Sequence, residues 1–223
     1  ADKIMIDHHE SPDNYATLMY SDVSMSSTCE MVYNIIKDMD PNGFTPDISE
    51  CLYTGIMTDT GSFRYPATTP ATHRAIAHLI ETGASGTEIH QRIYDSASFS
   101  RLKLLGLTLS NLKQIPNLPV VYMTLSQKEL NSCDYKKGDT EGFVNYGLSL
   151  EGIIFSCIMI ENENEGIIKI SFRSQGEFSV NDFARSYFNG GGHHNAAGGM
   201  SSDSIETTVA RFIESVQEVA HKF

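Results

Sequence analysis

The sequence predicts an α/β fold in which the remaining part of a parallel-sheet domain is followed by a smaller mixed α/β domain. Three observations support this prediction. A short apolar run at residues 4–6 ends abruptly in one acidic residue and two histidines. Helical patterns dominate residues 27–115, and two prolines then interrupt them. From residue 120 onward, runs rich in β-branched residues alternate with short helical patterns, which is typical of a second α/β unit.

The apolar run at residues 4–6 is predicted to be a buried strand of a parallel sheet, because it is short and is followed by polar residues. Ligands of such sheets bind just beyond the carboxyl ends of the strands, where Asp7, His8 and His9 stand. Successive side chains of a strand point to opposite faces, so we expect one histidine to bind a metal and the other to contact substrate. A structural cluster at the strand end is the alternative.

A second short strand is predicted at residues 16–21, and three helices with recognisable first residues follow. Ser27 begins the first helix, with a capping box completed by Glu30. Thr45 and Thr69 begin the next two, each followed by a proline in the first turn. The apolar faces expected for these helices are Met31, Val32, Ile35, Ile36 and Met39, then Ile48, Cys51, Leu52, Gly55 and Ile56, then Ala75, Ile76, Leu79 and Ile80.

Asp59 falls on the inner face predicted for the second helix, where apolar side chains are expected. A buried carboxylate without a partner is costly, so a metal ion, a cation or several hydrogen-bond donors should accompany it. Two interpretations stay open: Asp59 is a metal ligand, or it lies past the helix end and caps the loop. The hydroxyl side chains beside it and Arg64 would suit a phosphate pocket, although a lone arginine is more often a surface residue.

A further helix is predicted at residues 98–115, and two prolines then break the pattern. The predicted organisation is therefore a first domain at residues 1–97, a linker helix and proline-containing connection at 98–118, and a second domain at 119–223. The apolar face expected for the linker helix consists of Leu102, Leu105, Leu109 and Leu112.

The second domain is predicted to contain a strand at residues 120–125 and a short helix capped by Ser126 and Glu129. A β-branched hairpin should follow, with an acidic turn that ends in Gly166. Its strands are expected at 153–160 and 167–172, further short helices at 140–146 and 180–188, and a last helix from about Asp203.

The glycine run of this domain, Gly190, Gly191 and Gly192, is followed directly by His193. Glycines let the backbone approach a ligand closely, and their amides can point together at an anion when a helix begins after them. The polar residues after the run favour a phosphate or nucleotide cradle over a flexible turn. Arg173 and Ser174, at the exit of the second hairpin strand, are candidate partners of the same ligand.

The formal net charge of −12 argues against a protein that holds long DNA or RNA by neutralising many phosphates, because that mode requires clustered lysines and arginines. A short anionic substrate is compatible if divalent cations and a few arginines supply positive charge locally. No apolar run is long enough for a membrane span or a secretory signal, so we expect a cytoplasmic protein without a membrane partner. The four cysteines are scattered and are expected to be reduced core residues.

Three stretches together resemble a known family: residues 7–9, residues 55–64, and the glycine run with the Phe172-Arg173-Ser174 segment before it. This combination is similar to the DHH phosphoesterase family with its DHH-associated C-terminal domain. Within that family it most resembles the bifunctional oligoribonucleases and phosphoadenosine-phosphate phosphatases called nanoRNases. The resemblance implies hydrolysis of phosphoesters by two metal ions, usually manganese, in a cleft between two domains.

The resemblance also implies roles for individual residues. His8 and Asp59 would be ligands of the metal pair, Asp7 would support a ligating histidine, and His9 would contact the scissile phosphate. In the second domain, the terminal phosphate and the nucleotide would be held by Arg173, His193 and the backbone of Gly190, Gly191 and Gly192.

One departure from the family pattern matters. The family has a further motif of one histidine and two closely spaced aspartates, and a later aspartate that bridges the metals, and no stretch of this sequence supplies them. Because the chain also opens at Ala1, it resembles a fragment. We therefore expect at most partial occupancy by manganese, no turnover by these 223 residues alone, and an exposed flank of the first sheet that invites association, for example as a homodimer.

The expected function of the intact protein is hydrolysis of short oligoribonucleotides and of 3′-phosphoadenosine 5′-phosphate. Cleavage of linear or cyclic dinucleotides is an enzymatic alternative that uses the same kind of site. A non-catalytic nucleotide- or RNA-binding module is the alternative from a different class. Retention of nucleotide affinity in the presence of a chelator would favour the binding module, and manganese-dependent cleavage would favour the enzyme.

Overall fold

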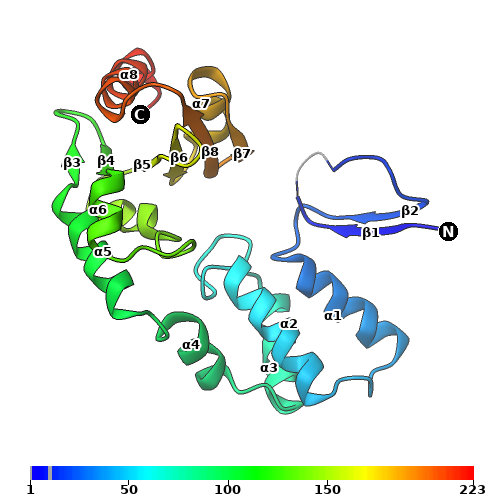
Figure 1. Cartoon of the computed structure of the whole chain (residues 1–223). Helices are drawn as coiled ribbons and strands as arrows, with labels where there is room; N and C mark the ends of the chain where they lie inside the picture. The colour runs from blue at the N-terminus through cyan, green and yellow to red at the C-terminus, as the bar shows by residue number, and fades with distance from the viewer. Residues whose placement is uncertain (1, 10–11) are drawn as a thin grey trace. The chain divides into compact units, whose positions relative to one another are not determined.

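The computed structural model describes residues 2–9 and 12–223, and their contacts divide the chain into two compact units, Ala1–Ser96 and Ala97–Phe223 (Figure 1). The predicted α/β class is confirmed, because the first unit contains a parallel strand pair with helices and the second contains a mixed sheet. The helix predicted as a linker belongs by its contacts to the second unit. Among the residues that the structure describes, no helix has the length and hydrophobicity needed to cross a membrane.

The first unit begins with strands β1 (Ile4–Asp7) and β2 (Leu18–Ser21), which pair in parallel with Ile4 opposite Leu18. The predicted parallel pairing is confirmed, but the strand is buried only in part. Met5 is buried, but Ile4 is 68% exposed and Leu18 is 60% exposed. Within the described residues β1 pairs only with β2, so apolar side chains on this small sheet are left without cover.

After β2, the described residues of the first unit form four helices: α1 (Thr28–Met39), α2 (Pro46–Asp59), α3 (Pro70–Glu81) and α4 (Gly86–Tyr94). The first three begin after the predicted caps, whose side-chain oxygens accept hydrogen bonds from backbone amides of the first turn. Their shared core includes the fully buried Ile56, Met57 and Leu79.

Several details of these helices differ from expectation. Ile80, predicted on the apolar face of α3, is 50% exposed, and Cys51, predicted on that of α2, is exposed. Met39, predicted on the apolar face of α1, is 82% exposed because it is the last helical residue. Helix α4 was not predicted, although Ser85 caps it and Glu88 lies in its first turn. Only Ile89 of α4 is buried, so the helix has too little apolar periodicity to be recognised from the sequence.

The second unit is built on a six-stranded sheet in the order β3-β4-β5-β6-β8-β7. Strands β4 and β5 pair in parallel, and the remaining pairs are antiparallel. The predicted hairpin is confirmed as the β5–β6 pair. The strands are β3 (Lys113–Gln114), β4 (Val120–Leu125), β5 (Phe155–Asn162), β6 (Ile167–Ser174), β7 (Gly191–His193) and β8 (Ala196–Ser201).

Helices pack against both faces of this sheet. Alternate side chains of a strand point to opposite faces, so the side chains of β5 enter two different cores. Phe155, Cys157 and Met159 enter one core, whereas Ile158 between them enters another. Helices α7 (Val180–Tyr187) and α8 (Ile205–Glu218) pack on the first core, with the short 3-10 helix η2 (Ala220–Lys222) after α8. Helices α5 (Phe99–Ser110) and α6 (Gln127–Ser132) and the 3-10 helix η1 (Phe143–Ser149) pack on the second.

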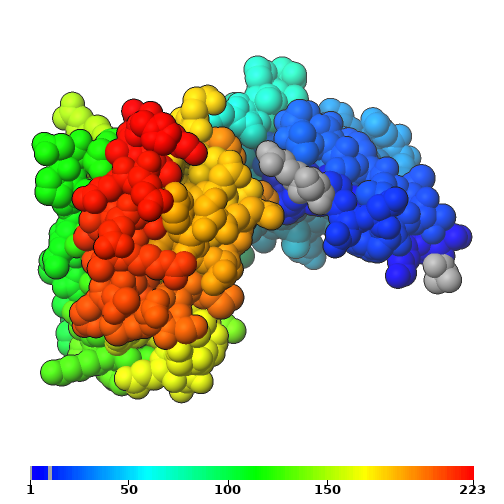
Figure 2. All heavy atoms as spheres, turned by 90° about the horizontal axis from the view of Figure 1, so that it is seen from above, coloured from blue at the N-terminus to red at the C-terminus, as the bar shows by residue number. Residues whose placement is uncertain are grey.

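The core under α7 and α8 is dominated by phenylalanines. The ring centroids of Phe155 and Phe183 lie 5.1 Å apart, and those of Phe172 and Phe188 lie 5.5 Å apart. Both distances are within the range of favourable aromatic contacts. In the space-filling view, α8, in orange to red, forms a continuous surface with the gold part of the chain that contains α7 (Figure 2). This packing gives the glycine-containing strands β7 and β8 a rigid support.

Helix α5 packs in a different register from the predicted one. Leu104 is fully buried, whereas Leu102 is 56% exposed and Leu109 is 39% exposed. Leucines occur at so many positions of this helix that its sequence does not specify a single apolar face, and contact with β4 decides the register. The predicted last turn is instead the edge strand β3, which pairs with β4.

Glu129→Gln should lower the free energy of unfolding at neutral pH by about 1 kcal/mol, because it removes the carboxylate of the Ser126 capping box. Burial raises the pKa of Glu129, but hydrogen bonds from Ser126 and Asn111 outweigh burial and leave that pKa below its ordinary value. The stabilisation is therefore present above the unfolded-state pKa of about 4.3 and is lost as the pH falls through the lower folded-state pKa. Urea denaturation at a series of pH values measures this.

Glu165→Gln is the matched control. A hydrogen bond from Lys169 also lowers the pKa of Glu165, but this ion pair is exposed, so its loss should change stability less at neutral pH. Equal effects of the two substitutions at neutral pH would contradict the prediction.

Candidate functional site

The structure brings His8 and Asp59 together in the first unit, as the family resemblance implied. His8 follows β1 and Asp59 is the last residue of α2, and Nε2 of His8 lies 3.7 Å from Oδ2 of Asp59. Nδ1 of His8 lies 3.2 Å from the carbonyl oxygen of Met25. A carbonyl only accepts, so Nδ1 carries the proton and the lone pair of a neutral ring is on Nε2, facing the carboxylate.

This arrangement fits a divalent cation. When the His8 ring is neutral, its Nε2 lone pair and the Asp59 carboxylate oxygen face each other without a hydrogen-bond donor between them, and imidazole and carboxylate are both common metal ligands. Among residues 2–9 and 12–223, however, no group of three or more histidine, cysteine, aspartate or glutamate side chains is arranged to hold a metal ion. His8 and Asp59 are therefore candidate metal ligands, and the described residues place no third candidate beside them.

Asp59 is not on a buried face, contrary to expectation. Its side chain is 47% exposed at the end of α2. The alternative role of capping the following loop is carried by Thr60 instead. The buried Thr60 hydroxyl donates to the carbonyl of Ile56 at 2.6 Å and accepts from the amide of Phe63 at 3.0 Å. The Asp59 carboxylate is thus left directed toward His8.

The chain turns sharply directly after this aspartate. Gly61, Ser62 and Phe63 all have left-handed backbone conformations, with φ values of 56°, 60° and 65°. For the two residues with side chains this conformation is strained, and such strain concentrates at functional sites. Arg64 closes the turn by donating from Nε to the carbonyl of Gly61 at 2.8 Å, which uses one of the five N–H donors of its guanidinium.

Asp7 orients His9 rather than His8. Its Oδ1 lies 2.6 Å from Nδ1 of His9 and also accepts from the His9 backbone amide at 3.2 Å. The side-chain hydrogen bond with His9 is the main cause that lowers the pKa of Asp7. The expected separation of the two histidines onto opposite faces was wrong, because the strand ends at Asp7 and the two rings contact each other at 4.7 Å.

Arg173 and Ser174 lie at the end of β6, where the sequence placed them. Arg173 stands opposite Ala196 of β8, and its Nη1 donates to the Phe172 carbonyl at 2.9 Å. The Ser174 hydroxyl is buried, donates to the Phe178 carbonyl at 2.6 Å and accepts from Asn195 at 2.8 Å. Ser174 thus holds the loop before α7 in place.

The glycine run approaches its own backbone closely. A Cβ on Gly190 would lie 1.9 Å from the carbonyl oxygen of Gly198, and one on Gly192 would lie 2.5 Å from that of Ala196. No helix begins after the run, because Gly191–His193 is β7 and pairs with β8. The amides of Gly190 and Gly192 donate to the Ala184 carbonyl and the Asn181 side chain, at 3.1 and 2.9 Å. These two amides are therefore engaged within the protein.

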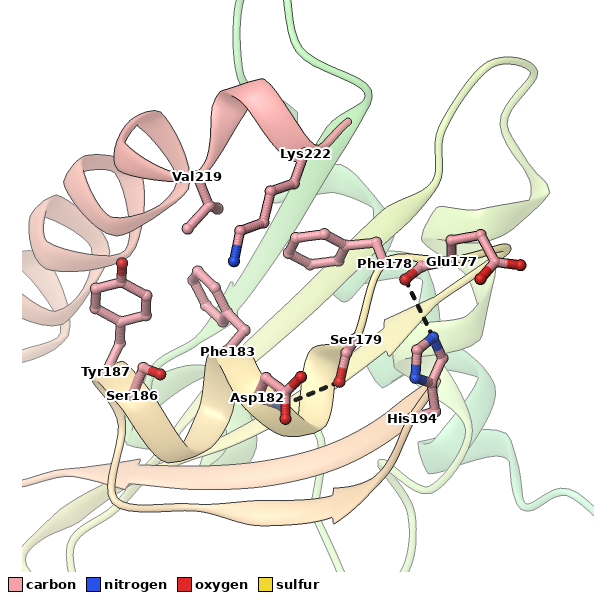
Figure 3. A pocket seen from close by; sticks show the side chains of 10 residues that line it. All are labelled: Glu177, Phe178, Ser179, Asp182, Phe183, Ser186, Tyr187, His194, Val219 and Lys222. Atoms are coloured by element: carbon pink, nitrogen blue, oxygen red, sulfur yellow. Dashed lines mark hydrogen bonds between the residues drawn. The ribbon is translucent and has the colours of Figure 1, made fainter.

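A hollow of about 290 Å³ lies between α7 and the C-terminal segment (Figure 3). Phe183 and Tyr187 form part of its wall, and the Lys222 ammonium points into it. His194 lines it and lies 3.2 Å through Nε2 from the Glu177 carbonyl. Neither the candidate arginine Arg173 nor the glycine run contributes to this hollow.

Gly190→Ala should lower the free energy of unfolding by about 2 kcal/mol or more, because the added methyl meets backbone atoms that cannot move away. Gly106→Ala in α5 is the matched control, since nothing lies within 4 Å of its Cβ position. That change should stabilise the protein by roughly 0.5 to 1 kcal/mol through helix propensity. Chemical denaturation of both variants measures the difference, and a Gly190→Ala variant as stable as the wild type would contradict the packing described above.

The fold and site define a two-domain chain in which a histidine and an aspartate face each other in a small parallel α/β unit, followed by a mixed-sheet unit. Residues 1–56 match the model of the DHH family, N-terminal domain, and residues 117–222 match the DHHA1 domain. The chain belongs to the DHH family and carries a DHHA1 domain.

Its relatives include two curated proteins named bifunctional oligoribonuclease and PAP phosphatase NrnA. The Bacillus subtilis protein is 30% identical over 195 residues, which are 86% of this chain and 60% of the relative. The Thermus thermophilus protein is 31% identical over 216 residues, which are 96% of this chain and 64% of the relative. The chain thus spans about three-fifths of the length of these relatives.

A solved structure gives the same fold. An exopolyphosphatase-related protein from Bacteroides fragilis superposes with a TM-score of 0.95 at 38% sequence identity. The match covers 98% of this chain and 64% of that protein. The arrangement of strands and helices described above is therefore that of a known DHH-family structure.

Proposed function

We propose that the intact protein is a metal-dependent phosphoesterase that hydrolyses short oligoribonucleotides and 3′-phosphoadenosine 5′-phosphate. The observation that carries this proposal is the facing pair of acceptors, His8 Nε2 and Asp59 Oδ2, 3.7 Å apart. Two acceptors so placed favour a cation between them. The names of the two relatives support the class of substrate.

His8 and Asp59 would hold manganese, with the His8 ring fixed by the Met25 carbonyl. When bound, such ions supply positive charge to the phosphate and make hydroxide available near neutral pH. His9 would contact the scissile phosphate. Its Nδ1 is held by Asp7, so this contact would be made through Nε2. The lowered pKa of Asp7 keeps that residue ionised and able to orient His9 at neutral pH.

In the second unit, Arg173 and His193 would bind the terminal phosphate and the nucleotide. Both are on strands that join in one sheet through β8, with Arg173 and His193 each opposite Ala196. In a chain of net charge −12, such a local cation is what attracts a small anion, because the overall charge repels it. The engaged amides of Gly190 and Gly192 would act by fixing this strand pair.

We infer that these 223 residues alone do not turn over substrate, because the described part provides two facing donors and no cluster of three. The assay measures manganese-dependent cleavage of a diribonucleotide, a cyclic dinucleotide and 3′-phosphoadenosine 5′-phosphate. It is run in parallel on this chain and on the full-length product of the gene. We expect cleavage by the full-length protein, loss of that cleavage in Asp59→Asn, and none by the chain.

Each outcome of this assay is informative. Cleavage by the 223-residue chain that Asp59→Asn abolishes would refute the inferred inactivity and keep the phosphoesterase. A full-length protein that cleaves only dinucleotides would replace the proposed substrate. Asp38→Asn, at an exposed position of α1, is the matched control for Asp59→Asn and should cleave like the wild type. A full-length protein that cleaves none of the three substrates would remove the proposed function.

Arg173→Met should weaken binding of 3′-phosphoadenosine 5′-phosphate by about 10-fold, because a hydrogen bond to a charged group contributes roughly 1.5 to 3 kcal/mol. Calorimetric titration of the chain with chelator present measures this without any contribution from metal. Lys169→Met is the control, because it lies on the same strand four residues earlier and removes the same charge. Equal losses in both variants would indicate that net charge, not Arg173, governs affinity.

A further inference from the structure

Glu30 is a buried carboxylate that the proposed chemistry does not use. It is 3% exposed at the start of α1 and accepts hydrogen bonds from two hydroxyl groups, those of Ser26 and Thr72. The Thr72 contact measures 3.0 Å and joins α1 to the first turn of α3. Ser26 and Thr72 are themselves buried, at 4% and 0% exposure. A buried acidic group with two dedicated donors is a costly feature that needs a purpose.

The expected role of Glu30 was to complete the capping box of α1, but its side chain turns away from the cap. Ser27 caps the helix by accepting from the Glu30 backbone amide at 3.0 Å, which does not involve the Glu30 carboxylate. In the complete capping boxes at Thr69 and Ser126, the side chain of the third helical residue accepts a hydrogen bond from the backbone amide of the cap residue. Glu30 makes contacts with Ser26 and Thr72 instead. The helix start therefore does not explain the Glu30 side chain.

The segment that Glu30 holds leads directly to His8. Met25 and Ser26 share one planar peptide bond, so anchoring Ser26 restrains the direction of the Met25 carbonyl. That carbonyl lies 3.2 Å from Nδ1 of His8 and sets the position of the ring proton. The opposite nitrogen of the ring faces Asp59. Contacts thus run from Thr72 through Glu30 and Ser26 to the imidazole.

We propose that Glu30 is a positioning residue for His8: through Ser26 it holds the Met25 carbonyl that keeps the proton on Nδ1 and the lone pair on Nε2. This inference rests on the proposed function for the use of Nε2 as a metal ligand, but the tautomer itself is independent of metal. Acceptors that orient a ligating histidine in this way raise its affinity for metal. The same restraint would keep the neutral ring from placing a proton between Nε2 and Asp59.

The test measures the tautomer of His8 in the metal-free chain by long-range proton–nitrogen NMR correlation. The pH is set about two units above the ordinary histidine pKa, so that the ring is neutral. The signals are assigned with a His8→Gln variant. We expect Nδ1 to be protonated in the wild type, and the share of protonated Nε2 to rise in Glu30→Met, which has no acceptor. Glu30→Gln retains an acceptor oxygen and should restore the wild-type pattern.

Two further variants separate positioning from a loss of folding. Ser26→Ala removes only one hydroxyl and should shift the tautomer as Glu30→Met does, which keeps the test open if Glu30→Met does not fold. Glu129→Met removes a partly buried carboxylate of the second unit, the one that completes the Ser126 capping box, and should leave His8 unchanged. When Glu30→Met or Ser26→Ala is made in the full-length protein, we expect manganese affinity, measured by electron paramagnetic resonance, to fall about 10-fold.

The outcomes distinguish this inference from the proposed function. An unchanged tautomer in Glu30→Met and Ser26→Ala, or a wild-type ring with its proton on Nε2, would overturn the role of Glu30 whatever manganese does. A tautomer that shifts as expected, together with a full-length protein that binds no manganese, would support the positioning role and remove the metal site.

Discussion

The orientation of the His8 imidazole is the constraint on which the candidate site of the first unit depends. One ring nitrogen is held by the Met25 carbonyl and the other faces the Asp59 carboxylate. These partners come from the loop before α1 and from the end of α2. The orientation of the ring therefore depends on how β1, α1 and α2 are packed together. The core around Ile56 and Met57 fixes α2 and thereby fixes where its last residue points.

Hydrogen bonds from short polar side chains help to hold the candidate site residues in position. The Thr60 hydroxyl holds the left-handed turn after Asp59, and Asp7 holds His9. In the second unit, Ser174 and Asn195 tie the loop before α7 to the end of β6. In each case a short side chain satisfies backbone groups where the chain leaves regular structure, which keeps functional side chains in place without a large core.

The glycine run illustrates how a sequence motif can have a structural reason that differs from the one its composition suggests. Small residues at Gly190 and Gly192 permit close approach, as expected, but the atoms approached are backbone atoms of β8. The run is therefore a tightly paired strand at the sheet edge, with His193 at its end. Its rigidity positions the histidine, and the substrate contacts proposed for this unit depend on side chains more than on backbone amides.

Sequence alone determined the elements whose signals are local. The caps at Ser27, Thr45 and Thr69 and the β5–β6 hairpin were predicted, because caps and alternation act over a few residues. The closeness of His8 and Asp59, which are far apart in the sequence, was implied only by the family resemblance. Tertiary structure alone decided the register of the leucine-rich α5, the partner of Asp7, the carbonyl that orients His8 and the strand formed by the glycine run. Each of these depends on which segments meet in space, and neither helical periodicity nor a backbone carbonyl leaves a distinguishing mark in the sequence.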